Sequence, residues 1–266
     1  LPGWKGLVML ALLLLAGACL GSLATLILGK FLTPEELLDY QILIIYPLQF
    51  IPAMLYAAGK SHANENFDTP GVPLDNGRFS PVGGLWMALM AAVATIACAL
   101  VTEPAIALLP AMPEYIKKMM EMLVGGPLWV ALLSTAVFAP IFEEWLCRGM
   151  ILRGMLRKYS PATAIVISAA FFAVIHMNPW QAIPAFILGC LFGLVYYKTG
   201  SLKLTMLMHC ANNAFSVLLT RIPQAQGKEY IYEMFSDKVC YGFVYAACLT
   251  LVIYFAIRLI KTEFTK

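Results

Sequence analysis

Apolar residues gather into runs long enough to cross a lipid bilayer, and short polar segments separate these runs along the whole chain. A helix needs about 20 apolar residues to span the hydrocarbon core of a membrane. The pattern therefore predicts an all-α polytopic membrane protein with about eight transmembrane helices in one domain, residues 1–266. The expected spans are Leu7–Leu28, Leu38–Ala58, Val82–Val101, Pro127 through Glu144, Pro161–Ile175, Ala182–Tyr197, Leu202–Thr220 and Val239–Ile260.

The polar segments carry signals for helix starts and loops. Thr33 followed by Pro34 is typical of a helix N-terminus, because a threonine hydroxyl caps free backbone N–H groups and proline suits the first turn. The stretch from Lys60 to Pro81 is rich in Pro, Gly, Asn and Asp and predicts a surface loop. Met112–Leu123 mixes charged and apolar residues, which predicts an amphipathic helix at the membrane interface.

Composition supports the membrane assignment. Hydrophobic residues make up 61% of the chain and charged residues 12%, whereas about 25% of an ordinary soluble domain is charged. The net charge of +3 is too small to indicate binding to nucleic acid. The seven cysteines are scattered and form no C-x-x-C pair, so we expect neither a disulfide framework nor a thiolate metal site. The lipid bilayer is the expected surrounding.

The distribution of positive charge predicts the orientation of the chain. With eight spans both termini lie on one side, and that side would hold twelve of the 18 lysines and arginines, including the basic turn 153–158. Lysine and arginine are enriched in cytoplasmic loops. We therefore expect both termini in the cytoplasm, with the plasma (inner) membrane as the location.

Two adjacent glutamates lie at the end of the fourth apolar run. Ionisable side chains at membrane depth cost a few kcal/mol each, so each one is a functional hypothesis. Glu144 and Arg148 are four residues apart with the acid first, the favourable order for a helical ion pair. Adjacent helical residues point about 100° apart, so Glu143 would be left on a different face of the helix. Glu143 is thus the candidate for chemistry.

The two histidines in apolar spans are the candidate partners of Glu143. Glu143 and His176 lie at equal counts from a turn near Tyr159, so helical segments on both sides would place them at one depth and facing each other. Phe172 shares a helix face with His176, and His209 shares one with Asn213, because each pair is four residues apart. The Pro179 break after His176 favours a water-containing cavity within the bundle.

These residue types allow several chemistries. A glutamate paired with a histidine can hold and deprotonate water, and a histidine with an asparagine amide can stabilise an oxyanion. Glu143, His176 and His209 also form a possible zinc set, although the chain has no HExxH helix. Axial haem ligation and a proton relay in a transporter are further alternatives. Each of these residues, taken alone, is as often a packing or hydrogen-bonding residue as a functional one.

Three motifs occur in order: Glu143-Glu144-x-x-x-Arg148, Phe172-x-x-x-His176 and His209-x-x-x-Asn213. Over roughly residues 127–220 the chain resembles the CAAX protease and bacteriocin-processing family of intramembrane glutamic endopeptidases. The type II CAAX prenyl proteases of the Ras-converting kind are the members that it resembles. The resemblance implies a hydrolase that cleaves peptide or protein substrates, some of them prenylated.

Site roles follow from the resemblance as well. It implies that Glu143 and His176 activate water, that His209 and Asn213 stabilise the oxyanion, and that Glu144, Arg148 and Phe172 support them. It implies no cofactor, with zinc as a rival proposal. Some members of this family act in bacteriocin immunity or as scaffolds, so a non-proteolytic membrane protein of the same fold is the alternative function, followed by a zinc-dependent membrane peptidase.

Overall fold

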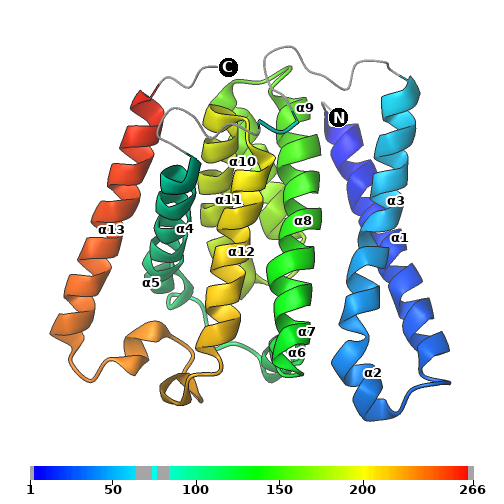
Figure 1. Cartoon of the computed structure of the whole chain (residues 1–266), viewed down its shortest axis with the longest axis horizontal. Helices are drawn as coiled ribbons and strands as arrows, with labels where there is room; N and C mark the ends of the chain where they lie inside the picture. The colour runs from blue at the N-terminus through cyan, green and yellow to red at the C-terminus, as the bar shows by residue number, and fades with distance from the viewer. Residues whose placement is uncertain (1–2, 64–73, 77–83, 263–266) are drawn as a thin grey trace.

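A computed structural model describes residues 3–63, 74–76 and 84–262, and every regular element in these ranges is a helix (Figure 1). The predicted all-α fold class is confirmed. Long helices run alternately up and down a bundle, and the start of α1 lies at the same end as the finish of α13 (Figure 1). The first elements are α1 (Trp4–Leu28), α2 (Pro34–Tyr40), α3 (Ile42–Ala63), α4 (Gly84–Val101), α5 (Glu103–Ile106) and α6 (Glu114–Val124).

A long helix from Leu128 to Met155 stands in the middle of the bundle. Two of its stretches follow the wider π-helical turn, and these stretches flank the double glutamate. Such turns are often found at functional sites, because the wider turn re-aims side chains. The successive parts of this helix are α7 (Leu128–Ala131), η1 (Leu132–Phe138), α8 (Ala139–Glu144), η2 (Trp145–Leu152) and α9 (Arg153–Met155).

The remaining elements complete the bundle around the long helix. Asn178 caps the helix that follows His176, since its side chain accepts a hydrogen bond from Gln181 N, and Pro179 occupies the first turn. This helix therefore starts three residues before the predicted Ala182. The elements are α10 (Pro161–Val174), α11 (Pro179–Thr199), α12 (Leu202–Leu219), η3 (Pro223–Ala225), η4 (Ile231–Met234) and α13 (Lys238–Lys261).

The predicted count of eight spans is not confirmed. Within the described residues, five helices are long and apolar enough to cross a membrane, or six if α2 and α3, which are bent by 50°, count as one span. α10 has 14 residues, about 21 Å of helix, which is short of the roughly 30 Å hydrocarbon core. α12 has the length, but Lys203, His209 and two asparagines lower its hydropathy.

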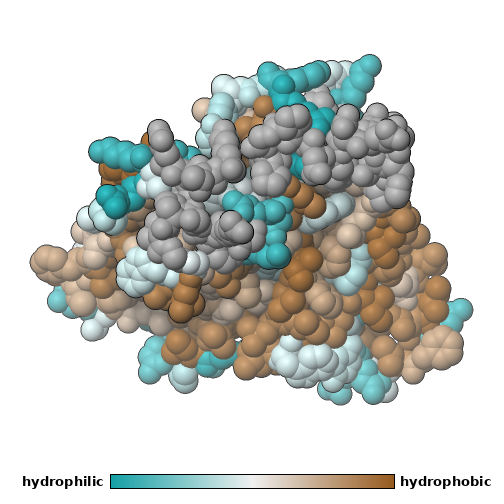
Figure 2. Space-filling view, turned by 45° about the horizontal axis from the view of Figure 1, so that its top comes forward, coloured by the Kyte–Doolittle hydropathy of each residue, from teal (hydrophilic) through white to brown (hydrophobic). Residues whose placement is uncertain are grey.

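Apolar side chains cover the sides of the bundle and hydrophilic ones gather at its ends (Figure 2). Large apolar residues on the outer helices are exposed, among them Leu26 at 71% and Phe243 at 74%. Glu144, Arg148 and Ser168, in contrast, are fully buried. This distribution is the reverse of a soluble core and agrees with an integral membrane protein.

Local predictions at the polar links are confirmed. Thr33 caps α2: its hydroxyl accepts from Glu36 N at 3.3 Å, and Glu36 in turn accepts from Thr33 N at 2.9 Å. α6 is the predicted amphipathic helix, begun at Glu114 rather than Met112. The predicted loop 60–81 begins too early, because α3 continues to Ala63, and most of its remaining residues lie outside the described ones.

Candidate active site

Glu144 and Arg148 form a fully buried ion pair on the long helix, as predicted from their spacing. Arg148 Nη1 donates to Glu144 Oε1 at 2.8 Å, and Arg148 Nη2 donates to the carbonyl oxygen of Gly189 on α11 at 2.9 Å. The guanidinium carbon lies 4.7 Å from the ring centre of Phe172 and 5.3 Å from that of Phe192. The Glu144 carboxylate and the two phenylalanine rings offset the free-energy cost of removing the guanidinium from water.

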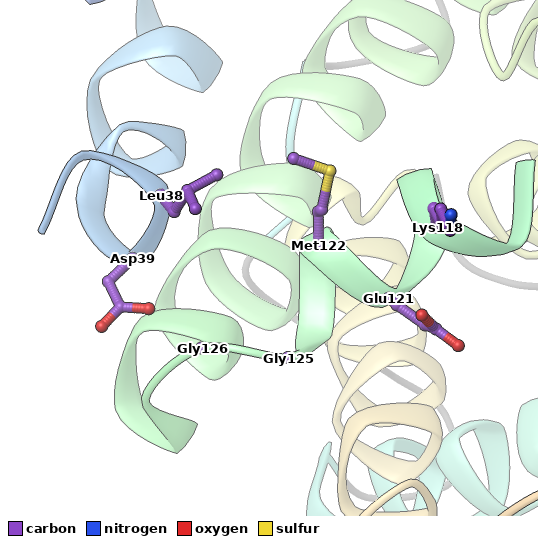
Figure 3. A pocket seen from close by; sticks show the side chains of 7 residues that line it. All are labelled: Leu38, Asp39, Lys118, Glu121, Met122, Gly125 and Gly126. Atoms are coloured by element: carbon purple, nitrogen blue, oxygen red, sulfur yellow. The ribbon is translucent and has the colours of Figure 1, made fainter. Parts of the chain in front are cut away.

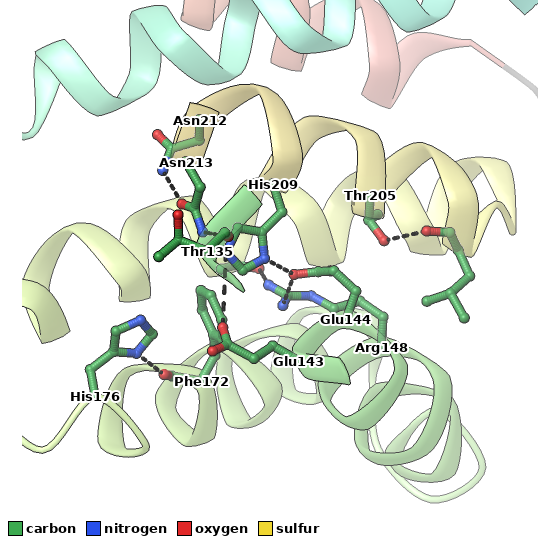
Figure 4. Close-up of polar contacts among 12 residues, drawn as sticks. Thr135, Glu143, Glu144, Arg148, Phe172, His176, Thr205, His209, Asn212 and Asn213 are labelled. Carbon is green, nitrogen blue, oxygen red and sulfur yellow. Dashed lines mark hydrogen bonds and ion pairs between the residues drawn. The ribbon is translucent and has the colours of Figure 1, made fainter. Parts of the chain in front are cut away.

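His209 joins the same network from α12 (Figure 4). Its Nδ1 lies 3.1 Å from Glu144 Oε1. An ionised carboxylate only accepts, so Nδ1 carries the hydrogen and donates it to Glu144. His209 Nε2 then faces Glu143, with 3.9 Å between Nε2 and Glu143 Oε2. Glu144 thus fixes the ring orientation of His209 and turns its second nitrogen toward Glu143.

Glu143 is held differently from Glu144. Its Oε1 accepts a hydrogen bond from the hydroxyl of Tyr46 on α3. Its Oε2 is buried and makes no hydrogen bond to any described residue. The residue is only 8% exposed, so a carboxylate oxygen without a hydrogen bond there is costly. The predicted ion pair of Glu144 with Arg148 is confirmed. Oε2 of Glu144 also lacks a hydrogen bond to a described residue, so the two glutamates differ in their partners: arginine for Glu144 and tyrosine for Glu143.

The contacts of the His176 ring are with Phe172. Within the described part of the chain, the side chains of His176 and Glu143 share no hydrogen bond or ion pair. His176 Nδ1 lies 2.8 Å from the carbonyl oxygen of Phe172, and its ring meets the Phe172 ring edge-on at 5.1 Å (Figure 4). The expected facing pair assumed continuous helix, but α10 ends at Val174 and His176 lies in the turn that follows.

Asn213 lies one turn beyond His209 on α12. Its Nδ2 donates to the carbonyl oxygen of Thr135 in η1 at 2.8 Å, and its Oδ1 accepts from Asn212 at 3.0 Å. Phe172 is the shared packing surface of the site, because its ring touches both histidines and the guanidinium of Arg148. The structure thus brings the site residues from α8, η2, α10 and α12 into one region.

The alternative zinc set is not assembled as a cluster. Among the residues that the structure describes, no three His, Cys, Asp or Glu side chains are grouped so that they could hold a metal ion. Glu143 and His209 are close, whereas the rings of His176 and His209 both contact Phe172.

Several contacts of the site were not predicted, including those of His209 with Glu144 and of Arg148 with the Gly189 carbonyl oxygen. Tyr46 reaches Glu143 from a helix 97 positions away in sequence, and Phe192 and the Thr135 carbonyl complete the surroundings of Arg148 and Asn213. A tyrosine hydroxyl inside an apolar segment needs a hydrogen-bond partner, which is the one signal in the sequence that could have found Tyr46.

A pocket of about 370 Å³ lies elsewhere, between α2 and α6 (Figure 3). It contains none of the predicted site residues. Its lining consists of Leu38, Asp39, Lys118, Glu121, Met122, Gly125 and Gly126.

A comparison with models of known protein families gave a match to the segment that carries the site residues. The family model of type II CAAX prenyl endopeptidases, Rce1-like, matches residues 125–215, a segment that contains all three motifs. This match supports assignment of the chain to the CAAX protease family. At the level of the family, the match supports a CAAX-type intramembrane endopeptidase with a peptide or protein substrate. Comparisons with curated proteins and with solved structures gave no significant match.

Proposed function

We propose that this CAAX protease-family member hydrolyses a peptide bond inside the bundle with water activated by Glu143. The observation that carries the proposal is the difference between the two glutamates. Oε2 of each glutamate is buried without a hydrogen bond to a described residue. The glutamates differ in their partners: Glu144 is neutralised by Arg148, whereas Glu143 turns its Oε2 toward His209 Nε2 and pairs with no arginine among the described residues. A buried carboxylate with a free oxygen is suited to take a proton from water.

The proposed reaction has two stages. Glu143 Oε2 takes a proton from water, and the water oxygen bonds to the carbonyl carbon of the substrate. The C–N bond then breaks as Glu143 gives that proton to the leaving nitrogen, so a carboxylic acid and an amine are released. Protonated His209, through Nε2, and the second N–H of Asn213 Nδ2 are the proposed donors to the oxyanion.

His176 keeps its place in the proposed water-activating pair. The Phe172 carbonyl oxygen can only accept, so His176 Nδ1 carries a hydrogen and Nε2 is left as the nitrogen that can contact water or substrate. Prenylated CAAX peptides are the first substrates that we propose, because the matched family model describes prenyl endopeptidases. We propose no metal in the reaction.

The test is cleavage of a quenched prenylated CAAX peptide by purified protein. Glu143→Gln should lower kcat by about 10²–10⁴-fold, the usual contribution of a general base, while the thermal unfolding midpoint stays near that of the wild type. Glu35→Gln is the matched control, since Glu35 is exposed on α2. Full cleavage by Glu143→Gln would overturn the mechanism. Stoichiometric zinc whose removal abolishes activity would overturn the metal-free scheme.

A further inference from the structure

Tyr46 brings a hydroxyl group to Glu143 from outside the region that carries the family match. It lies on α3, whereas the matched segment is 125–215. Its hydroxyl donates to Glu143 Oε1. Tyrosine placed in an apolar helix has many ways to satisfy its hydroxyl, including a backbone carbonyl oxygen. Here the partner is the carboxylate that we propose as the base.

The Tyr46 ring is held in place by contacts that do not depend on its hydroxyl. Its centre lies 5.6 Å from the ring of Phe50 and 6.5 Å from that of Phe142, the residue just before Glu143. Phe50 and Phe142 stack on each other at 5.2 Å with an interplanar angle of 17°. This aromatic group fixes α3 against α8, so removal of the hydroxyl alone would leave the packing intact.

The hydrogen bond makes the two oxygens of Glu143 unequal. Oε1 is engaged by Tyr46, and Oε2 is turned toward His209 Nε2 at 3.9 Å. A carboxylate held at one oxygen cannot rotate freely, so the other oxygen has a defined direction for proton transfer. Correct placement of a reacting group within a fraction of an ångström is worth orders of magnitude in rate.

We propose that Tyr46 is a positioning residue that orients the Glu143 carboxylate for the reaction. The proposal rests on the proposed function, and it adds to that function a residue of the N-terminal helices. Tyr46 acts through Glu143 and does not touch the substrate. The α1–α3 pair therefore contributes to catalysis as well as to membrane anchoring.

Tyr46→Phe tests the proposal in the prenylated-peptide assay. A hydrogen bond from a hydroxyl group stabilises a charged carboxylate. Loss of the Tyr46 hydrogen bond should therefore lower kcat by about 10–100-fold, with KM nearly unchanged. The acidic limb of the kcat–pH profile should move to higher pH. Other groups that face Glu143 are His209 from α12 and, on its own helix, Glu144 and Cys147, and Tyr46→Phe leaves all three unchanged.

Tyr40→Phe is the matched control. The Tyr40 ring packs on Trp129 at 5.9 Å, and its hydroxyl makes no hydrogen bond to another described residue. This variant should keep the wild-type kcat and pH profile. If Tyr46→Phe fails to fold, Tyr46→3-fluorotyrosine keeps the ring and the hydroxyl but makes a stronger donor, and the acidic limb should then move to lower pH.

The outcomes distinguish the positioning role of Tyr46 from the proposed role of Glu143 as the base. The inference about Tyr46 is overturned if Tyr46→Phe, or the fluorotyrosine variant, keeps the wild-type kcat and an unmoved acidic limb. In that case a loss of activity in Glu143→Gln still supports Glu143 as the base. Activity that survives Glu143→Gln overturns the proposed function itself, whatever Tyr46→Phe does. A loss in kcat that is fully explained by a smaller folded fraction also counts against a positioning role.

Discussion

Arg148 shows how one residue makes the buried charge of the site tolerable. Its guanidinium is 0% exposed and lies between the Glu144 carboxylate, the Gly189 carbonyl and two phenylalanine rings. Lysine offers neither the planar fork nor the stacking surface that this position uses. Breaking a buried pair is much more costly than breaking an exposed one, because the remaining charge stays buried without compensation.

Arg148→Ala should therefore lower the free energy of unfolding by about 3–5 kcal/mol, measured as a drop in the thermal unfolding midpoint of the purified protein. Lys203→Ala serves as the comparison, since the Lys203–Asp75 pair spans 2.8 Å but the lysine side chain is 70% exposed. Exposed pairs contribute about 0–1 kcal/mol. Equal effects of the two substitutions would contradict the buried-pair argument.

Sequence reasoning at the residue scale succeeded where a side chain depends on its own helix. The spacing of Glu144 and Arg148 predicted their ion pair, and helical phase separated Glu143 from it. The continuous helix assumed through His176 is not present, because α10 ends at Val174 and the turn that follows has Met177 at a positive φ of 55°. Equal counting from a turn is sound only while both segments remain helical.

At the scale of elements, α1 packs against α3 through small residues. A Cβ added to Gly17 would overlap the carbonyl oxygen of Gln49 and lie 2.6 Å from its carbonyl carbon, and one at Gly21 would lie 2.9 Å from Ile45 Cγ2. Small residues that allow close backbone approach are typical of helix pairs in membranes. The face of α3 that α1 covers is therefore set by backbone contact, which apolar patterning alone does not reveal.

Gly17→Ala should force this pair apart and destabilise the protein by about 1–3 kcal/mol, the usual range for overpacking. Gly59→Ala is the matched control on α3, since a Cβ there would meet nothing within 4 Å, and alanine favours helix over glycine. Thermal unfolding of both variants checks the prediction. An unchanged midpoint for Gly17→Ala would mean that α1 is free to shift along α3.

The limits of element prediction have the same physical origin. Helix ends with local signals, such as Thr33 before α2, were predictable, whereas the Asn178 cap of α11 was overlooked and that helix begins earlier than expected. The short α10 and the polar α12 were predicted as spans, but length and hydropathy do not qualify them. Both are packed inside the bundle, where protein partners replace lipid.

At the scale of the whole molecule, polar contacts tie the end of the bundle opposite the termini. Glu103 on α5 accepts from the backbone N–H of Ile231 and from the Tyr241 hydroxyl, which joins α5 to the segment before α13 and to α13 itself. Lys117 on α6 pairs with Glu229, and this hydrogen bond raises the pKa of the lysine. These contacts fix the loop after α12 against α5 and α6.

The arrangement of the helices makes the orientation of the chain testable. The start of α1 and the finish of α13 lie at one end of the bundle, and the η3–η4 segment lies at the other (Figure 1). In a cysteine-free background, Lys5→Cys and Lys261→Cys should react with a membrane-impermeant maleimide only after cells are permeabilised, because the more basic side is expected to be cytoplasmic. Lys228→Cys should react in intact cells. Labelling of Lys5→Cys and Lys261→Cys from opposite sides would contradict the bundle, whereas reversal of all three would contradict only the charge argument.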